Sequence, residues 1–158
     1  EYGLPSTRFD ARYHAGDDWY GARGQTYGQP VQAIARGRVT YSAPWGWGRD
    51  KGVVIIEHAM PDGSTWYSLY GHMEEVGGVT FPALYSCVEL GQVIGAVGHP
   101  RPAPHLHLEI RNFWPDTPGP GYYPVDPAVA GWTDPSRFIA EWRARLSGEA
   151  ALPAECCA

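Results

Sequence analysis

The chain has 158 residues and a formal net charge of −5 at pH 7, with 20 glycines and 15 prolines. Its length predicts one domain, residues 1–158, built around a single ordinary hydrophobic core. The acidic balance makes nucleic acid and anionic membranes poor partners, and no stretch reaches the roughly 18 apolar residues of a membrane span. The high content of glycine and proline favours a loop-rich β domain over a helical one.

The first half of the chain is expected to hold a β-hairpin between irregular segments. Residues 52–60 are apolar and β-branched, which predicts a strand, and residues 64–72 return as its partner. Between them, Pro61 fixes φ and Gly63 tolerates a positive φ, so a tight turn is expected. In chain order, the flanking elements are an irregular stretch (1–30), two short strands broken at Gly37 (31–43), a turn-rich loop (44–51) and a long connection (73–86).

The second half predicts further strands and one helix. Residues 105–111 alternate between polar and apolar side chains, the pattern of a half-buried strand. Asp134 is suited to cap a helix whose first position is Pro135, which predicts a helix over about 134–147. The other expected elements are two short strands around Gly91 (87–98), a proline-rich loop (99–104), a long loop (112–133) and a tail (148–158). The architecture is therefore mainly antiparallel β, with long loops, an open groove and a short C-terminal helix.

Three cysteines, Cys87, Cys156 and Cys157, leave two alternatives open. The odd number prevents a complete internal disulfide framework. Cys87 either pairs with one of the two tail cysteines or lies unpaired in the core beside a loose tail.

Three of the six histidines lie in two patterns. His14 and Asp18 belong to an H-x-G-x-D motif, and His105 and His107 to an H-x-H motif within the strand expected at 105–111. Alternation places His105 and His107 on one face, about 6.6 Å apart at ~3.3 Å per residue. Glu109 shares that face and is expected to orient a ligand or to pair with an arginine. Both patterns also arise without function, as a surface histidine beside a turn and as two hydrogen-bonded strand histidines.

The order of four further motifs sharpens this interpretation. The stretch 54–58 is a hydrophobic strand that ends in His58, and Y-x-H follows at 70–72, G-Q-x-I-G at 91–95 and P-H-L-H-x-E at 104–109. With H-x-G-x-D before them, the sequence resembles the lysostaphin-type zinc metalloendopeptidases, a family of peptidoglycan hydrolases, over residues 12 to 111. A V-D-P echo extends the resemblance, so that the core of the domain is expected at about 12–127.

The resemblance implies a role for each residue of the histidine patterns. His14, Asp18 and His107 are implied as ligands of one Zn²⁺ per chain. Two imidazoles and one carboxylate leave the fourth tetrahedral position open for water, which is typical of a catalytic zinc site rather than a structural one. His105 and His72 are implied as catalytic. We assign the general base to His105 and the stabilisation of the oxyanion to His72, although the two roles could be exchanged.

Neighbouring residues are expected to play supporting parts. His58 fits a structural position near the site, and His99 a solvated position in a loop. Tyr70 is expected to share a strand face with His72 and to support it. Asp17 is expected to point away from the metal, because the family uses the later carboxylate.

The resemblance implies a zinc-dependent endopeptidase that hydrolyses peptide bonds in peptidoglycan stem or cross-bridge peptides through a zinc-activated water. The alternative is a degenerate, non-catalytic relative that serves as a cell-wall binding or scaffold module. Loops 44–51, 73–86 and 112–124 are expected to wall the substrate groove, and the small-residue turn usual before P-H-L-H is replaced by 99–103. The sequences of these loops do not identify which peptide bond is cleaved. The protein is expected to be an extracytoplasmic monomer, whether secreted, periplasmic or associated with the cell wall.

Overall fold

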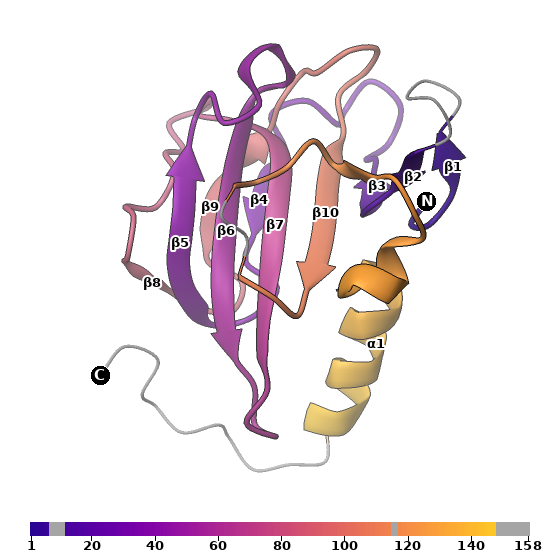
Figure 1. Ribbon diagram of the computed structural model, residues 1–158. Helices are drawn as coiled ribbons and strands as arrows, with labels where there is room; N and C mark the ends of the chain where they lie inside the picture. Colours follow the sequence, from indigo (N-terminus) through magenta and orange to yellow (C-terminus); the bar gives the residue numbers. More distant parts are fainter. Residues whose placement is uncertain (7–11, 115–116, 148–158) are drawn as a thin grey trace.

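Most of the chain forms one curved antiparallel sheet with a helix beside it (Figure 1). The computed structural model describes residues 1–6, 12–114 and 117–147. In chain order the elements are β1 (Pro5–Ser6), β2 (Arg12–His14), β3 (Asp17–Trp19), β4 (Pro30–Gln32), β5 (Gly37–Ala43), β6 (Gly52–Ala59), β7 (Thr65–Glu74), β8 (Cys87–Val88), β9 (Val93–Val97), β10 (Leu106–Arg111), β11 (Tyr122–Tyr123), β12 (Trp132–Thr133) and α1 (Pro135–Leu146), with 3₁₀ helices at Gly48–Asp50 and Pro127–Ala130. The mainly antiparallel β class with a short C-terminal helix is confirmed.

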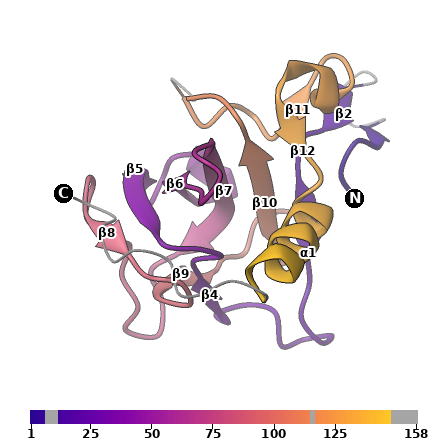
Figure 2. The same cartoon turned by 90° about the horizontal axis from the view of Figure 1, so that it is seen from below.

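The β6–β7 hairpin and β10 form the centre of the sheet, whose order is β12-β10-β7-β6-β5-β8. Alternate residues of β6 enter two apolar clusters, Val54 and Ile56 the larger one and Val53 and Ile55 the smaller one. An unbroken apolar run forms this strand because both of its faces are buried. Strands β4 and β9 lie on one side of the curved sheet and α1 lies beside β10 (Figure 2). They close the larger cluster, to which α1 contributes Ile139.

The helix begins where its sequence predicts. The Asp134 side chain accepts a hydrogen bond from the Arg137 backbone N–H at 2.9 Å, and Pro135 occupies the first turn. This cap satisfies one of the backbone donors that the start of a helix leaves free. No helix in the described ranges is long and apolar enough to cross a membrane.

Two stretches expected to be irregular contain short strands. Within 1–30, β1 and β2 join β11 in a three-stranded sheet, and β3 pairs with β10. Within 112–133, the chain forms β11, a 3₁₀ helix and β12. Strands of two or three residues carry almost no local pattern, because partners far away in the sequence stabilise them. They matter here because β2 and β3 position the site.

Strand β10 is not half-buried, as its alternation predicts, but buried on both faces over residues 106–111. Its polar face is covered because Glu109 and Arg111 pair with each other beneath Trp132. A polar face that satisfies its own hydrogen bonds can be buried at little cost.

Cys87 lies exposed in β8 and is disulfide-bonded, so the alternative of an unpaired core cysteine is wrong. The other two cysteines, Cys156 and Cys157, lie outside the described residues.

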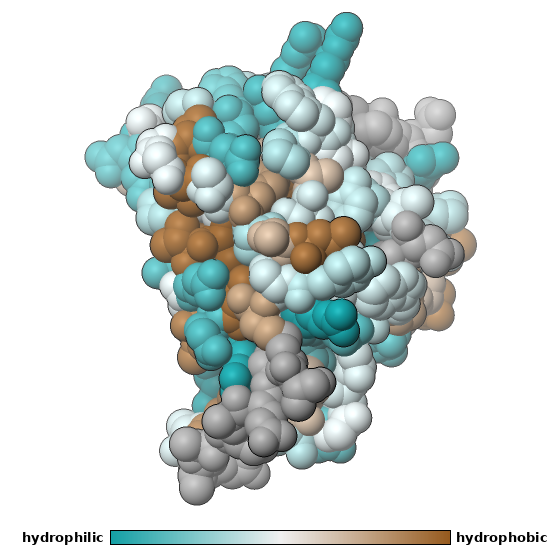
Figure 3. Space-filling view, turned by 90° about the vertical axis from the view of Figure 1, so that its left-hand side faces the viewer, coloured by the Kyte–Doolittle hydropathy of each residue, from teal (hydrophilic) through white to brown (hydrophobic). Residues whose placement is uncertain are grey.

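Figure 3 shows the side of the molecule that carries β5 and β8, where apolar surface alternates with hydrophilic surface. Exposed Leu84 and Leu90 flank β8 in the chain. Scattered apolar side chains of this kind are ordinary on a protein surface.

Candidate metal centre

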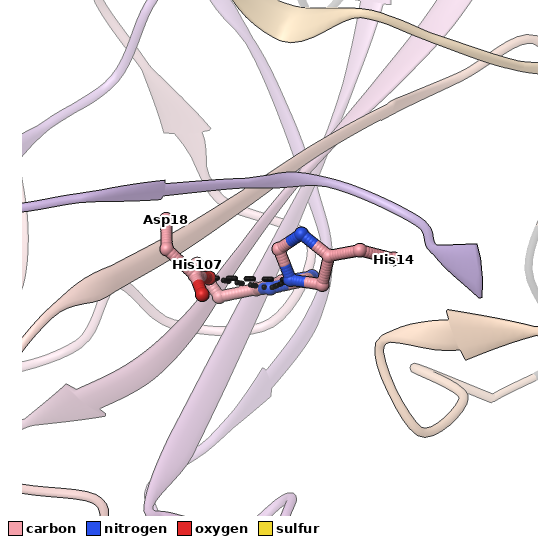
Figure 4. Close-up of side chains that lie close together, drawn as sticks. All are labelled: His14, Asp18 and His107. Carbon is pink, nitrogen blue, oxygen red and sulfur yellow. Dashed lines mark hydrogen bonds and ion pairs between the residues drawn. The ribbon is translucent and has the colours of Figure 1, made fainter. Parts of the chain in front are cut away.

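Two side chains of the H-x-G-x-D motif and one from β10, far away in the sequence, converge on one another (Figure 4). The His14 Nε2 and His107 Nδ1 atoms are 3.0 Å apart, and Asp18 Oδ1 lies 3.1 Å from His107 Nδ1 and 3.3 Å from His14 Nε2. Two ligands of a tetrahedral zinc ion, each about 2.0–2.1 Å from the metal, are roughly 3.3 Å apart. The three donor atoms therefore lie close to the spacing that zinc requires.

The H-x-G-x-D motif builds this cluster through strand pairing. Strand β3 runs antiparallel to β10, and Asp18 stands opposite His107 in the register. His14 ends β2, one short turn before β3. Gly16 forms that turn against β10, where any Cβ would overlap the Leu108 carbonyl oxygen. The motif thus requires glycine so that the turn can approach the strand that carries the third ligand.

A buried ion pair holds the His107 ring in one orientation. His107 Nε2 donates to Glu109 Oε1 at 2.9 Å, and Glu109 Oε2 accepts from Arg111 Nε at 2.7 Å and from Trp132 Nε1 at 2.6 Å. Although burial raises the pKa of Glu109, the nearby Arg111 and His107 lower it to about 2. The carboxylate stays ionised and fixes the proton on Nε2, so that Nδ1 faces Asp18 and His14. Glu109 therefore contacts His107 through one carboxylate oxygen and pairs with Arg111 through the other.

We predict that Glu109→Gln weakens zinc binding by about 10–100-fold, the usual cost of losing a partner behind a metal ligand. The amide keeps the shape of the side chain but loses the charge that orients His107. The measurement is a competition titration against a chromophoric chelator, with Glu141→Gln on the exposed face of α1 as the matched control. An unchanged affinity in a correctly folded Glu109→Gln protein would remove Glu109 from this role.

The pH dependence of zinc binding follows from His107. Burial lowers the pKa of His107, but the hydrogen bonds to Asp18 and Glu109 outweigh this effect and raise the pKa to about 9 in the metal-free protein. Below that pH zinc must displace the proton on His107 Nδ1, so zinc affinity should rise about tenfold per pH unit from pH 7 towards 9. Titrations at several pH values, and calorimetry in two buffers of different ionisation enthalpy, measure the proton released. An affinity that is independent of pH over this range would contradict the assignment.

Two further imidazoles border the cluster, and backbone carbonyl groups fix both. His105 Nδ1 donates to the Ala103 carbonyl oxygen at 2.9 Å, and its Nε2 lies 3.6 Å from Asp18 Oδ1. His72 Nδ1 donates to the Asp50 carbonyl oxygen at 2.7 Å, and its ring centroid is 4.5 Å from that of His105. Burial is the main cause that lowers the pKa of His72, to about 3. The neutral His72 ring therefore presents Nε2 as a proton acceptor.

A β-bulge turns His72 towards the site. The register of β6 and β7 shifts so that Gly52 faces Met73 while Val53 faces Gly71, which leaves His72 as the extra residue. Its φ of 61° lies in the left-handed region, where a non-glycine residue is uncommon and is often part of a functional site. The bulge reverses the alternation of the strand at this one position.

The expected support of His72 by Tyr70 is therefore wrong. Tyr70 lies on the opposite face, buried in the larger apolar cluster, where its hydroxyl accepts a hydrogen bond from the Ile34 backbone N–H at 2.9 Å. Simple alternation would place the two side chains together, but the bulge separates them. The Asp50 carbonyl group and the Trp47 ring, 4.9 Å from that of His72, support the histidine instead.

The other supporting residues lie as expected. His58 is buried, donates from Nδ1 to the Arg36 carbonyl oxygen at 2.8 Å and accepts at Nε2 from the Ser68 hydroxyl at 2.7 Å, which fits a structural residue. His99 is exposed in the proline-rich loop. Asp17 accepts hydrogen bonds from the Tyr2 N–H and the Ser136 hydroxyl, away from the cluster.

All five predicted site residues line one cavity of about 470 Å³. Loops 44–51 and 112–124 contribute to its walls as expected, but 73–86 does not, because its Phe81 packs against the larger apolar cluster. The proline-rich loop takes that place through Arg101 and Pro102. The full lining is His14, Asp18, Tyr20, Trp47, Asp50, His72, Arg101, Pro102, His105, His107, Pro120, Gly121 and Tyr122.

Two aromatic residues that line the site could not be identified from the sequence. The Trp47 ring lies 5.3 Å from that of His107, and its Nε1 donates to the Gly119 carbonyl oxygen at 2.5 Å. Tyr20 stacks on His105 at 5.3 Å. The one signal for Trp47 is Gly71, opposite His107 in the register, where a Cβ would overlap the indole. The meaning of Gly71 can be understood only when the strand pairing is known.

Comparisons with known proteins agree with this architecture. Similar solved structures include the catalytic domain of the antimicrobial peptidase lysostaphin from Staphylococcus simulans (22% identity, 88% of this chain and 88% of that chain, TM-score 0.62). Others are a mutant of the catalytic domain of the prophage-encoded M23 protein EnpA from Enterococcus faecalis (25%, 81% and 85%, 0.54) and a zinc-containing peptidase from Vibrio cholerae (24%, 70% and 32%, 0.51). No curated protein matches the chain. The model of peptidase family M23 matches residues 12–127, and the protein therefore belongs to this family of lysostaphin-type metallopeptidases.

Proposed function

We propose that this protein is a zinc-dependent endopeptidase that cleaves peptide bonds of bacterial peptidoglycan, in stem or cross-bridge peptides. The observation that carries the proposal is the cluster of His14 Nε2, Asp18 Oδ1 and His107 Nδ1 at the spacing of zinc ligands, beside two further imidazoles in one cavity. Membership in family M23 and the zinc-containing relative from Vibrio cholerae support the choice of metal. The resemblance to lysostaphin-type enzymes supports the choice of substrate.

The metal would be held by His14, Asp18 and His107, one ion per chain, and would supply Lewis-acid polarisation of the scissile carbonyl and a water whose pKa is lowered to about 7. His105 is the proposed general base, because its Nε2 lies 3.6 Å from Asp18 Oδ1, one of the proposed ligand atoms. Its Nδ1–H bond to the Ala103 carbonyl stabilises the imidazolium that results. The proton at Nε2 then passes to the leaving nitrogen.

His72 is proposed to stabilise the negative charge that develops on the scissile carbonyl oxygen. Its ring adjoins that of His105 in the same cavity, and the Asp50 carbonyl group holds its Nδ1–H. Because the neutral ring carries its proton on Nδ1, Nε2 must take up a proton from solvent before it can donate to the oxyanion. A donor held in place before the reaction avoids the cost of reorganising solvent around the developing charge.

The same proposal covers domain, location and assembly. We propose one metallopeptidase domain over residues 1–158, with its core at about 12–127, acting as a monomer outside the cytoplasm. The disulfide bond of Cys87 supports an oxidising compartment. The substrate itself lies in the cell wall, which fits a secreted, periplasmic or wall-associated protein.

Digestion of purified cell walls tests the proposal. The zinc-loaded protein is incubated with walls of several cross-bridge types, and new amino termini are identified by mass spectrometry. We expect one type of bond to be opened, and no new termini with chelator-treated protein. Stoichiometric zinc without new termini from any wall would favour the non-catalytic scaffold instead.

A further inference from the structure

The proline-rich loop that walls the cavity is bonded at both ends to the residues proposed as catalytic. At its start, the Gly98 N–H donates to the His72 carbonyl oxygen at 2.8 Å. At its end, the Ala103 carbonyl accepts from the His105 ring. Prolines at 100, 102 and 104 fix φ at three positions in between. The backbone of the loop is therefore held at a set place relative to both imidazoles.

What the loop carries is a guanidinium group. Arg101 is exposed and lines the cavity together with the two catalytic imidazoles. Within the described part of the chain it forms no ion pair, whereas Arg111, the arginine behind the metal cluster, is buried against Glu109. Among the described residues that line this cavity, Arg101 is the one arginine or lysine. A guanidinium presents a planar fork of donors that matches a carboxylate.

The same cavity also carries a negative charge. Asp50, which supports His72 through its carbonyl group, also lines the cavity and is exposed. An acidic and a basic side chain thus line the same cavity, so a carboxylate of a bound peptide is attracted to Arg101 and repelled by Asp50.

We propose that Arg101 binds a carboxylate of the substrate next to the scissile bond, so that the enzyme prefers acidic cross-link peptides to neutral ones such as polyglycine. This inference rests on the proposed peptidase function and names the substrate class of the same site. Arg101 is a specificity residue: it touches the substrate but takes no part in the proton transfers.

Matched peptides test this assignment. Two synthetic D-alanyl-diaminopimelate cross-linked peptides differ at the carboxyl group of the diamino acid that lies next to the scissile bond, which is either free or an amide. Pentaglycine is the neutral third substrate. For the zinc-loaded protein we expect kcat/KM to be about tenfold higher for the free acid than for the amide, as for a charge-assisted hydrogen bond in a partly exposed site. Salt should reduce this ratio.

Variants then assign the preference to one residue. Arg101→Gln should bring the ratio of acid to amide close to one, Arg101→Glu should reverse it, and Arg101→Lys should keep part of it. The control, Arg145→Gln on the exposed surface of α1, changes the net charge equally and should leave the ratio unchanged. Zinc content should be the same in all of these proteins. A structural role of Arg101 would lower both rates together and leave the ratio intact.

Failure of the inference differs from failure of the proposed function. Equal cleavage of acid and amide, cleavage of pentaglycine alone, or a preference that survives Arg101→Gln would each overturn the role of Arg101 while the peptidase function stands. If no peptide is cleaved, the proposed function is in question. Equilibrium binding of the acid and amide peptides to the wild type and to Arg101→Gln then decides on Arg101 without catalysis, and equal affinities would overturn it.

Discussion

His107→Ala should abolish zinc binding under conditions in which the wild type retains one ion per chain. The substitution removes one of three protein ligands, the one that a buried carboxylate holds in place through Nε2. The loss should exceed the roughly 10–100-fold cost of removing a partner behind a ligand. Peptide hydrolysis should disappear with the metal. Zinc content after dialysis and the rate of hydrolysis are measured on the same preparation.

His99→Ala is the matched control for this experiment. His99 lies exposed in the proline-rich loop and outside the cavity, so its removal should leave zinc content unchanged. Circular dichroism shows whether the His107→Ala protein is folded. A folded protein that still binds one zinc ion per chain would place the metal elsewhere.

The sequence could predict the pairs of residues that are close in the chain. Alternation along residues 105–111 places His105 and His107 in one cavity, as the structure finds. The spacing of Asp134 and Pro135 correctly predicts the start of the helix. Both inferences depend on local geometry, in which the side-chain direction follows from the period of the element.

Features that depend on pairing between distant segments could not be predicted in this way. The bulge that turns His72 into the cavity exists only in the register between β6 and β7. Burial of the polar face of β10 depends on Trp132, which β12 brings to Glu109. The place of Trp47 over His107 depends on Gly71 and Gly119, in two other segments. Tertiary contacts decided each of these, and no local period records them.

His105→Ala and His72→Ala should separate chemistry from metal binding. Both variants keep His14, Asp18 and His107, so zinc content should remain at one ion per chain. The rate should nevertheless fall by about 10²–10⁴ for His105→Ala, the cost of losing a general base. For His72→Ala it should fall by about 10²–10³, the cost of losing one donor to an oxyanion.

The pH profiles of these two variants distinguish their roles. If His105 is the base, removal of this residue should abolish the loss of activity that protonation of the base causes at acidic pH, whereas His72→Ala should keep that limb at a lower rate. The reverse result would exchange the two assignments. If His105→Ala loses zinc while His107→Ala keeps it, ligand and base are interchanged on β10. Full activity in both His105→Ala and His72→Ala, with zinc still bound, would move the proton transfers away from these imidazoles.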